Sequence, residues 1–206
     1  MTFPERPYPS VADYFDAYAD QLGRALASVS RDRLAAAERL LAEAVARDAH
    51  VYACGNGGSA AISNHLVCDH ARGVSADTGL RPRVHSLSAT IEMLTAVAND
   101  VAYAEVFAAQ LRLFGRPGDV LITISSSGDS ENVVRAVEWA RANGMASIAM
   151  TGFAGGRTAR LADVDLHVDA DNYGVVEDVH QSLMHVLAQS LRMARMPGEL
   201  VAARKF

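Results

Sequence analysis

Residues 119–130 constrain the fold more than any other stretch of this chain. A short run of apolar, mostly β-branched residues from Val120 to Ile124 ends in a cluster of hydroxyls and a glycine, and a helical pattern follows at once. An apolar run of this length between turn residues is typical of a buried strand in a parallel sheet. The sequence therefore predicts a strand that leads directly into a helix.

The loop between that strand and that helix is rich in serine. Its hydroxyls and the free N–H groups at the start of the next helix together would stabilise an anion. The loop contains no lysine, so it differs from the nucleoside triphosphate P-loop, whose lysine reaches the phosphates. A small phosphorylated ligand is expected, and the alternative is a serine-rich turn that only caps the helix.

Strand and helix patterns alternate through most of the chain. Strands are predicted at 51–54, 84–87, 119–125, 146–151 and 164–168. Helices are predicted at 10–28, 31–48, 59–72, 90–98, 102–114, 131–143 and 174–194. This alternation predicts an α/β three-layer sandwich with a central parallel sheet, preceded by an N-terminal helix pair. Ligands of such sheets bind beyond the carboxyl ends of the strands.

A chain of 206 residues is expected to form one domain, 1–206. Within it, 50–194 would be the ligand-binding α/β core. The helices within 10–48 have broad apolar faces, which could cover their own sheet or pack against another subunit. Of these two roles, oligomerisation is favoured.

Composition excludes several classes of function. The formal charge is −5 and no basic stripe is present, so a nucleic-acid partner is not expected. No apolar run approaches the roughly 20 residues of a membrane span, and the N-terminus has no signal-peptide pattern, so the cytoplasm is the expected location. Lys205 is the only lysine, which argues against Schiff-base chemistry and covalent pyridoxal phosphate.

A second small-residue loop, Gly55–Ser59, also follows a strand and precedes a helix. Its three glycines would let the backbone approach a ligand closely and present N–H groups. Asn56 could hydrogen-bond sugar hydroxyls, and Ser59 could cap the helix. Farther along, Asn99 and Asp100 could orient substrate hydroxyls or simply end a helix.

Two predicted helices each carry a histidine and a carboxylate. His65 and Asp69 are four residues apart, and Glu177, Gln181 and His185 also step by four, so each set shares one helix side. His65, Asp69, Glu177 and His185 could supply four ligands to Zn²⁺ or a related ion. The same groups could form an acid/base pair without metal, or be ordinary hydrogen-bonded members of the core.

The other histidines have no comparable spacing. His70, His85 and His167 are interpreted as structural. His180 lies near Glu177 in the sequence and is a weaker candidate for supporting the site.

In order and type, these motifs resemble those of sugar isomerase (SIS) domain proteins. The resemblance rests on Gly55–Ser59, Asn99–Asp100, Ser125–Ser130 and the helix with His180 and His185, and it extends over nearly the whole chain. It is strongest to the phosphoheptose isomerases, which convert sedoheptulose 7-phosphate to D-glycero-D-manno-heptose 7-phosphate. It implies a flavodoxin-like SIS fold and a homotetramer whose active sites borrow residues from neighbouring subunits.

The resemblance also implies roles for individual positions. Sugar contacts are implied at Asn56, Gly57, Gly58, Asn99 and Asp100. Phosphate contacts are implied at Ser125, Ser126, Ser127 and Ser130, with Ser59 nearby. Substrate contacts and metal ligation are both implied at Asp69 and Glu177, and ligation also at His65 and His185, so that one Zn²⁺ per subunit is expected. Asp69 and His185 are the expected acid/base groups, with Glu177 as a substitute base.

Two positions depart from the family pattern. Asp69 stands where the family has Glu, which withdraws the carboxylate by about 1.5 Å. Glu177 stands where the family has Gln, which adds a negative charge. With a metal, two carboxylates would weaken its Lewis acidity; without one, they would repel each other and one could hold a proton.

The leading hypothesis is therefore aldose–ketose isomerisation of a phosphorylated sugar, with a heptose 7-phosphate as the expected substrate. One alternative is a non-catalytic SIS protein that senses a sugar phosphate or acts as an adaptor. The other alternative is an isomerase of a different sugar phosphate.

Overall fold

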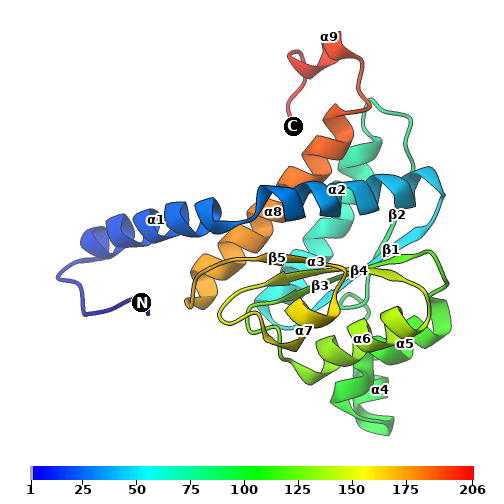
Figure 1. Cartoon of the computed structure of the whole chain (residues 1–206), viewed down its shortest axis with the longest axis horizontal. Helices are drawn as coiled ribbons and strands as arrows, with labels where there is room; N and C mark the ends of the chain where they lie inside the picture. Colours follow the sequence, from blue (N-terminus) through cyan, green and yellow to red (C-terminus); the bar gives the residue numbers. More distant parts are fainter. Residues whose placement is uncertain (1) are drawn as a thin grey trace.

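Five parallel strands form the centre of the fold in the computed structural model, which describes residues 2–206 (Figure 1). They are β1 (His50–Gly55), β2 (Arg83–Ser86), β3 (Val120–Ser125), β4 (Ala146–Thr151) and β5 (Val164–His167), in the order β2-β1-β3-β4-β5. The predicted parallel sheet and all five predicted strands are confirmed.

The strands are apolar because helices cover both faces of the sheet. Every residue of β3 is buried, and its register places Ile122 beside Ala53 of β1 and Ile148 of β4. Successive side chains point to opposite faces, so Leu121 and Ile122 enter different cores. An alternating polar pattern would have left one face open to water.

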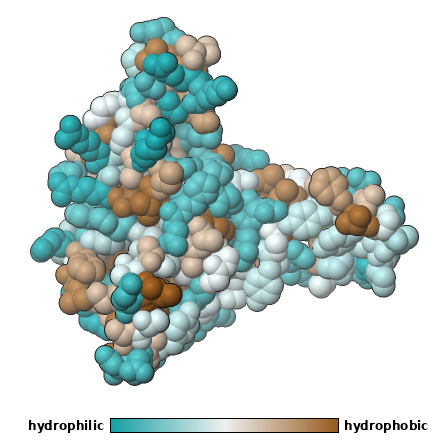
Figure 2. Space-filling view, turned by 180° about the vertical axis from the view of Figure 1, so that it is seen from behind, coloured by the Kyte–Doolittle hydropathy of each residue, from teal (hydrophilic) through white to brown (hydrophobic). Residues whose placement is uncertain are grey.

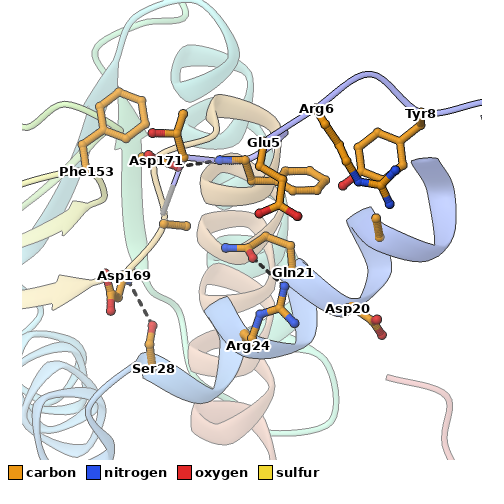
Figure 3. A pocket seen from close by; sticks show the side chains of 14 residues that line it. Glu5, Arg6, Tyr8, Asp20, Gln21, Arg24, Ser28, Phe153, Asp169 and Asp171 are labelled. Carbon is orange, nitrogen blue, oxygen red and sulfur yellow. Dashed lines mark hydrogen bonds between the residues drawn. The ribbon is translucent and has the colours of Figure 1, made fainter. Parts of the chain in front are cut away.

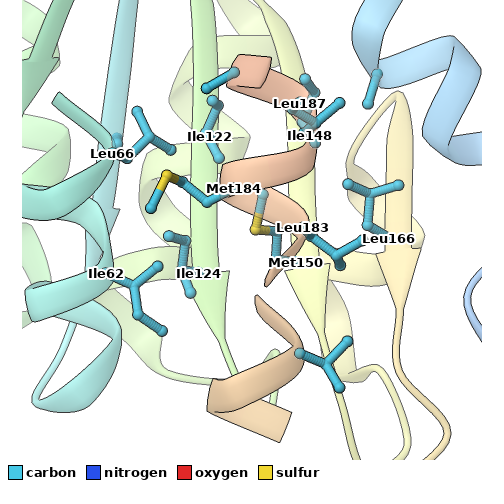
Figure 4. Close-up of a cluster of buried hydrophobic side chains, with 14 of the residues drawn as sticks. Ile62, Leu66, Ile122, Ile124, Ile148, Met150, Leu166, Leu183, Met184 and Leu187 are labelled. Atoms are coloured by element: carbon cyan, nitrogen blue, oxygen red, sulfur yellow. The ribbon is translucent and has the colours of Figure 1, made fainter. Parts of the chain in front are cut away.

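One face of the sheet is covered by α2 (Arg31–Ala46), α3 (Gly58–Val67) and α8 (Tyr173–Met193) (Figure 1). Figure 4 shows the core between them, where Met184 of α8 lies among isoleucines of β3 and leucines of α3 and α8. The other face is covered by α5 (Val106–Phe114), α6 (Glu131–Ala142) and α7 (Gly156–Leu161). Three layers result, as predicted.

The N-terminal helix pair is also confirmed. α1 (Val11–Ser28) projects from the body of the fold, while its partner α2 lies on the sheet (Figure 1). α1 meets the start of α8, where the Tyr18 hydroxyl donates to Asp178 at 2.7 Å. Val11 and Phe15 near the free end of α1 are exposed.

The structure adds turns that the sequence pattern did not indicate. The helix predicted to run to about residue 72 leaves the α-helical form at Val67, and Cys68–Gly73 form a π-helical turn. The short helices α7 and α9 (Gly198–Val201) were not predicted, because segments this short carry no helical period. The predicted helices at 90–98 and 102–114 correspond to α4 (Ile91–Asp100) and to a 3₁₀ turn, Tyr103–Glu105, followed by α5.

α8 is the longest helix of the described chain, at 21 residues. Its buried apolar residues lie toward the sheet and α3, whereas Glu177 and Asp178 lie elsewhere around the helix. Among residues 2–206, no helix combines the length and hydropathy needed to cross a membrane.

The position of Met184 predicts a large packing effect. Met184→Ala should lower the free energy of unfolding by about 2–5 kcal/mol, because it opens a cavity in the core. Met193→Ala is the matched control on the same helix; its side chain is half exposed, so we expect a loss below about 0.5 kcal/mol. Urea unfolding followed by circular dichroism measures both, and equal losses would contradict the assigned packing.

Candidate functional site

The chain changes direction across the sheet between β1 and β3. From β1 it moves outward to β2, then returns to β3 on the other side of β1 and continues to β4 and β5. The loops that follow β1 and β3 therefore separate at the carboxyl edge of the sheet, which is where ligands of open α/β sheets bind. A cavity of about 140 Å³ lies there.

Both loops and the start of α8 line this cavity. The serine loop contributes Ser125, Ser126, Ser127 and Ser130, the first loop contributes Asn56 and Ser59, and β3 contributes Ile124; Tyr173 and Glu177 come from α8. Seven of the predicted substrate-contacting residues thus line one space. Tyr173 was not predicted, since an aromatic residue at a helix start carries no sequence signal for a ligand.

The hydroxyls of the serine loop fall into two kinds. Ser125 Oγ accepts a hydrogen bond from the Gly128 N–H at 3.2 Å, and Ser127 Oγ accepts one from the Asp129 N–H at 3.3 Å, so these two shape the loop. Ser126 Oγ is buried and has no partner among the described residues. Ser130 is the N-cap of α6, yet its side chain makes no capping bond. Two hydroxyls therefore remain for a ligand at the N-terminus of α6, where an anion is stabilised.

Gly128 gives the loop its sharp turn. It has φ of 64°, and a Cβ at this position would overlap the carbonyl oxygen of Gly155, at the start of α7. Only glycine therefore lets the loop approach α7 so closely.

Arg157 of α7 holds the outer side of the same loop. Its guanidinium contacts the Asp129 carboxylate at 2.8 Å and the Glu131 carboxylate at 2.9 Å. The hydrogen bond to Arg157 keeps the pKa of Asp129 below its ordinary value. The acidic residues of the loop are therefore paired with a cation, which lowers their repulsion of a bound anion. Sequence reasoning missed Arg157 because α7 itself was not predicted.

An amide pair fixes the loop after β1. Asn56 and Asn132 exchange two side-chain hydrogen bonds of 2.9 Å, and the Tyr103 hydroxyl donates to Asn56 Oδ1 at 2.7 Å. This network holds the Asn56 amide at the mouth of the cavity. Asn132 and Tyr103 were not predicted, because each acts across a long distance in the sequence.

Glu177 lies directly against the first loop. A Cβ at Gly58 would overlap its carboxylate, so the glycine makes room for the acid. Burial, and then the nearby charge of Asp178, raise the pKa of Glu177 above its ordinary value. A carboxyl group that keeps its proton closer to neutrality suits proton transfer.

A second cluster lies farther along α8. Asp69, in the π-helical turn, places Oδ2 at 2.6 Å from His185 Nδ1 and Oδ1 at 3.4 Å from His65 Nε2. The shorter carboxylate therefore still reaches both imidazoles. Gln181 completes the cluster, with Nε2 at 3.0 Å from both His65 Nδ1 and His185 Nε2.

The donor set of this cluster fits a divalent cation. One ligand atom each from His65, Asp69 and His185 lie within 4.8 Å of one another. Two imidazoles and a carboxylate match the protein ligands of catalytic zinc sites.

The fourth predicted ligand, Glu177, lies outside this group. Eight residues of helix separate Glu177 from His185, which corresponds to about 12 Å along the axis. Gln181, one turn closer, fills the place expected for Glu177. The structure thus divides the four predicted residues between the serine-lined cavity and the imidazole cluster.

The remaining histidines are held by other contacts. His180 is fully buried with Nε2 3.2 Å from the Thr151 carbonyl, and burial lowers its pKa to about 4. His70 is likewise buried beside the Met184 carbonyl, with a pKa lowered to about 4. Burial keeps both rings neutral near pH 7, so they serve packing. His85 stacks on His50, and His167 contacts Thr151.

Asn99 and Asp100 are not brought to the cavity of their own chain. They lie exposed in the last turn of α4, where the Asn99 amide donates to Asp100 at 2.8 Å.

A larger cavity of about 690 Å³ lies elsewhere, between the N-terminal segment, α1 and residues 169–171 (Figure 3). Figure 3 shows acidic and basic side chains around it, among them Arg6, Arg24 and Asp171. It shares no lining residue with the serine-lined cavity or the imidazole cluster. Size alone therefore does not identify the site.

Comparison with known proteins agrees with this geometry. A family model described as SIS domain matches residues 13–152. The phosphoheptose isomerase of Bordetella avium is 40% identical over 161 residues, covering 77% of this chain and 81% of the relative. The phosphoheptose isomerase of Alteromonas mediterranea is 33% identical over 178 residues, covering 85% of this chain and 89% of the relative.

A solved structure agrees over a similar length. The phosphoheptose isomerase of Neisseria gonorrhoeae superposes with a TM-score of 0.80 at 32% identity, covering 88% of this chain and 96% of that one. The chain therefore belongs to the SIS-domain family and, within it, to the phosphoheptose isomerases.

Proposed function

We propose that this protein isomerises sedoheptulose 7-phosphate to D-glycero-D-manno-heptose 7-phosphate. The observation that carries the proposal is a serine-lined cavity at the carboxyl edge of the sheet, with acid/base groups along the helix that borders it. The cavity at the start of α6 suits a phosphate, and one side of α8 presents a carboxyl group to it and an imidazole two turns farther along. Family membership supports the same reaction.

The phosphate would bind in the serine loop. Ser126 offers a hydroxyl without a partner among the described residues, and Ser130 offers one that does not cap α6; both lie at the N-terminus of that helix, which stabilises an anion. This binding energy comes from a group remote from the reacting carbons, so it can be used to hold the sugar in position for proton transfer.

The reaction moves one proton between neighbouring carbons. A base removes a proton from C1 of the ketose and the C2 carbonyl oxygen gains a proton, which gives an enediol; the C1 hydroxyl then loses its proton to become the aldehyde carbonyl while a proton is returned to C2. Without a bound ion His185 can act as the base, because Asp69 accepts from its Nδ1–H and leaves unprotonated the Nε2 that otherwise accepts from the Gln181 amide. Asp69, 2.6 Å from His185, is the second acid/base group, and Glu177, whose pKa is raised, is the substitute base beside the serine-lined cavity.

We also propose that His65, Asp69 and His185 hold one Zn²⁺ per subunit. When bound, the ion would supply a Lewis acid that polarises the carbonyl oxygen, in place of proton transfer by His185. Asp69 would be the single charged ligand, and its contacts with both imidazoles already gather the donors in one place.

We further propose a homotetramer in which neighbouring subunits complete the active site. The exposed apolar residues Val11 and Phe15 on the projecting α1 support self-association, and the hydrophobic spots along this arm are visible in Figure 2. Asn99 and Asp100, which lie outside the cavity of their own chain, are available to a neighbouring one.

The first functional prediction concerns turnover. The wild-type protein should convert sedoheptulose 7-phosphate to the aldose, and His185→Ala should lower kcat by about 10²–10⁴-fold through loss of proton transfer. His85→Ala, which changes an exposed histidine of β2, should leave kcat unchanged. NMR of the sugar product measures both.

The outcome separates the competing hypotheses. If the wild-type protein forms no aldose with or without Zn²⁺, sedoheptulose 7-phosphate is not its substrate. Binding without turnover on any sugar phosphate would favour the non-catalytic SIS alternative.

The second prediction concerns the serine loop. Gly128→Ala should raise KM for the sugar phosphate by at least about tenfold, because the added methyl forces the loop away from Gly155. Gly118→Ala is the matched control: Gly118 also has positive φ, at 90°, but a Cβ there meets nothing. Steady-state kinetics with equal KM values for the two variants would argue against phosphate binding in this loop.

The third prediction concerns pH. Because the charge of Asp178 contributes to the raised pKa of Glu177, Asp178→Asn should lower that pKa. If Glu177 acts as a base, the rise of kcat/KM on the acid side should move to lower pH, since the carboxylate then forms earlier in a titration from acid. Tyr18→Phe, which removes the partner of Asp178 but keeps its charge, is the control. A pH profile of Asp178→Asn that overlies the wild-type curve would exclude Glu177 from proton transfer.

A further inference from the structure

Gln181 occupies a central place in the imidazole cluster, although its sequence position indicates no role. It lies on α8 one turn after Glu177 and one turn before His185. Its single amide group reaches a nitrogen of His65 from α3 and a nitrogen of His185 from its own helix, both at 3.0 Å. No other side chain of the described residues bridges the two rings from this side.

The hydrogen bonds of Gln181 determine where the imidazole protons lie. An amide nitrogen only donates, so His65 Nδ1 and His185 Nε2 must be unprotonated in this arrangement. The protons of the two neutral rings then lie on His65 Nε2 and His185 Nδ1. Those nitrogens face the two oxygens of Asp69, at 3.4 and 2.6 Å. Gln181, His65, Asp69 and His185 thus form a closed ring of side chains.

The same ring has a second arrangement. A half-turn of the Gln181 amide exchanges its nitrogen and oxygen without moving any other atom. The oxygen then accepts hydrogen bonds from N–H groups at His65 Nδ1 and His185 Nε2. In these tautomers the unprotonated nitrogens are the ones that face Asp69. Two nitrogen lone pairs and a carboxylate oxygen then address one space, which is the donor set of a divalent cation.

We propose that the amide orientation of Gln181 decides whether this cluster is ready to bind a divalent cation. With its nitrogen toward the rings, Gln181 holds the metal-free arrangement, in which His185 donates to Asp69 and the protonated Nε2 of His65 faces the other Asp69 oxygen at 3.4 Å. With its oxygen toward the rings, it fixes the tautomers that ligate. One residue on α8 therefore orients both histidine ligands, as hydrogen-bond acceptors behind metal-bound histidines do. The inference rests on the proposed zinc site and adds to it a positioning residue.

Two substitutions test the inference on the metal-stripped full-length protein. Gln181→Leu keeps a similar volume but cannot accept a hydrogen bond from either imidazole, so the dissociation constant for Zn²⁺ should rise by about 10–100-fold. The carboxylate of Gln181→Glu only accepts hydrogen bonds, which favours the ligating tautomers of both imidazoles. This variant should therefore bind Zn²⁺ at least as tightly as the wild-type protein does. Gln189→Leu, the same change at an exposed position two turns further on α8, should bind Zn²⁺ like wild type. Isothermal titration with Zn²⁺ alone measures all four proteins.

A second readout follows the protons directly. In ¹⁵N NMR of the histidine side chains, metal-free wild type should show the proton on Nε2 of His65 and Nδ1 of His185. Addition of Zn²⁺ should move both protons to the opposite nitrogens, which face Gln181. This readout needs no variant, so it stands even where a substitution impairs folding.

Three outcomes would overturn the inference: Zn²⁺ affinity unchanged in Gln181→Leu, protons that stay in place when Zn²⁺ is added, or no Zn²⁺ binding by wild type. Isomerase activity of metal-stripped wild type is measured separately. Activity that persists there without any Zn²⁺ binding would reject the role of Gln181 and leave the proposed reaction intact. If Zn²⁺ binding responds to Gln181 as predicted but the protein has no isomerase activity, the role of Gln181 stands and the proposed reaction is rejected.

Discussion

The packing of α8 against the sheet is the interaction on which the site depends. Val176, Val179 and Met184 are fully buried against β3, β4 and α3, which fixes both the axis and the rotation of the helix. With the rotation fixed, the side that carries Glu177 and His185 must face the loop after β1 and the end of α3. A rotation of one residue, about 100°, would turn these groups away from the cavity and bury polar side chains in the core. The same apolar contacts that stabilise the fold therefore also orient the Glu177 and His185 side chains.

Local sequence signals were sufficient for the sheet and for the two loops. The strand that ends at Ser125 and the glycines after Cys54 are local patterns, and their convergence follows from the rule that parallel strands end at one edge. Contacts between distant segments could not be predicted in this way. Asn132 hydrogen-bonds Asn56 across 76 residues, and Arg157 hydrogen-bonds Asp129 from a helix too short to show a helical hydrophobic period. The π-helical turn that carries Asp69 also has no sequence signature, since a single wide turn leaves the apolar pattern nearly unchanged.

The division of α8 shows what spacing can and cannot indicate. Glu177, Gln181 and His185 share one side of the helix, as predicted, but a shared side does not give a common ligand. Each step of four residues also advances about 6 Å along the axis. Glu177 therefore lies beside Gly58 and the serine-lined cavity, while Gln181 and His185 lie beside His65. Only the position of α3 along α8 decides which of the three meets which partner.

This division changes the electrostatic meaning of the two departures from the family pattern. The extra negative charge of Glu177 does not join the imidazole cluster, whose donors carry the single charge of Asp69. A divalent cation there would be only partly neutralised, so two carboxylates no longer weaken its Lewis acidity as the sequence suggested. Glu177 instead lines the serine-lined cavity, where burial and Asp178 already favour its protonated form. A bound phosphate would raise the pKa of Glu177 further, because like charges disfavour ionisation. Ligand binding and protonation of Glu177 are therefore coupled, and the bound sugar phosphate itself would help to keep a proton donor in place.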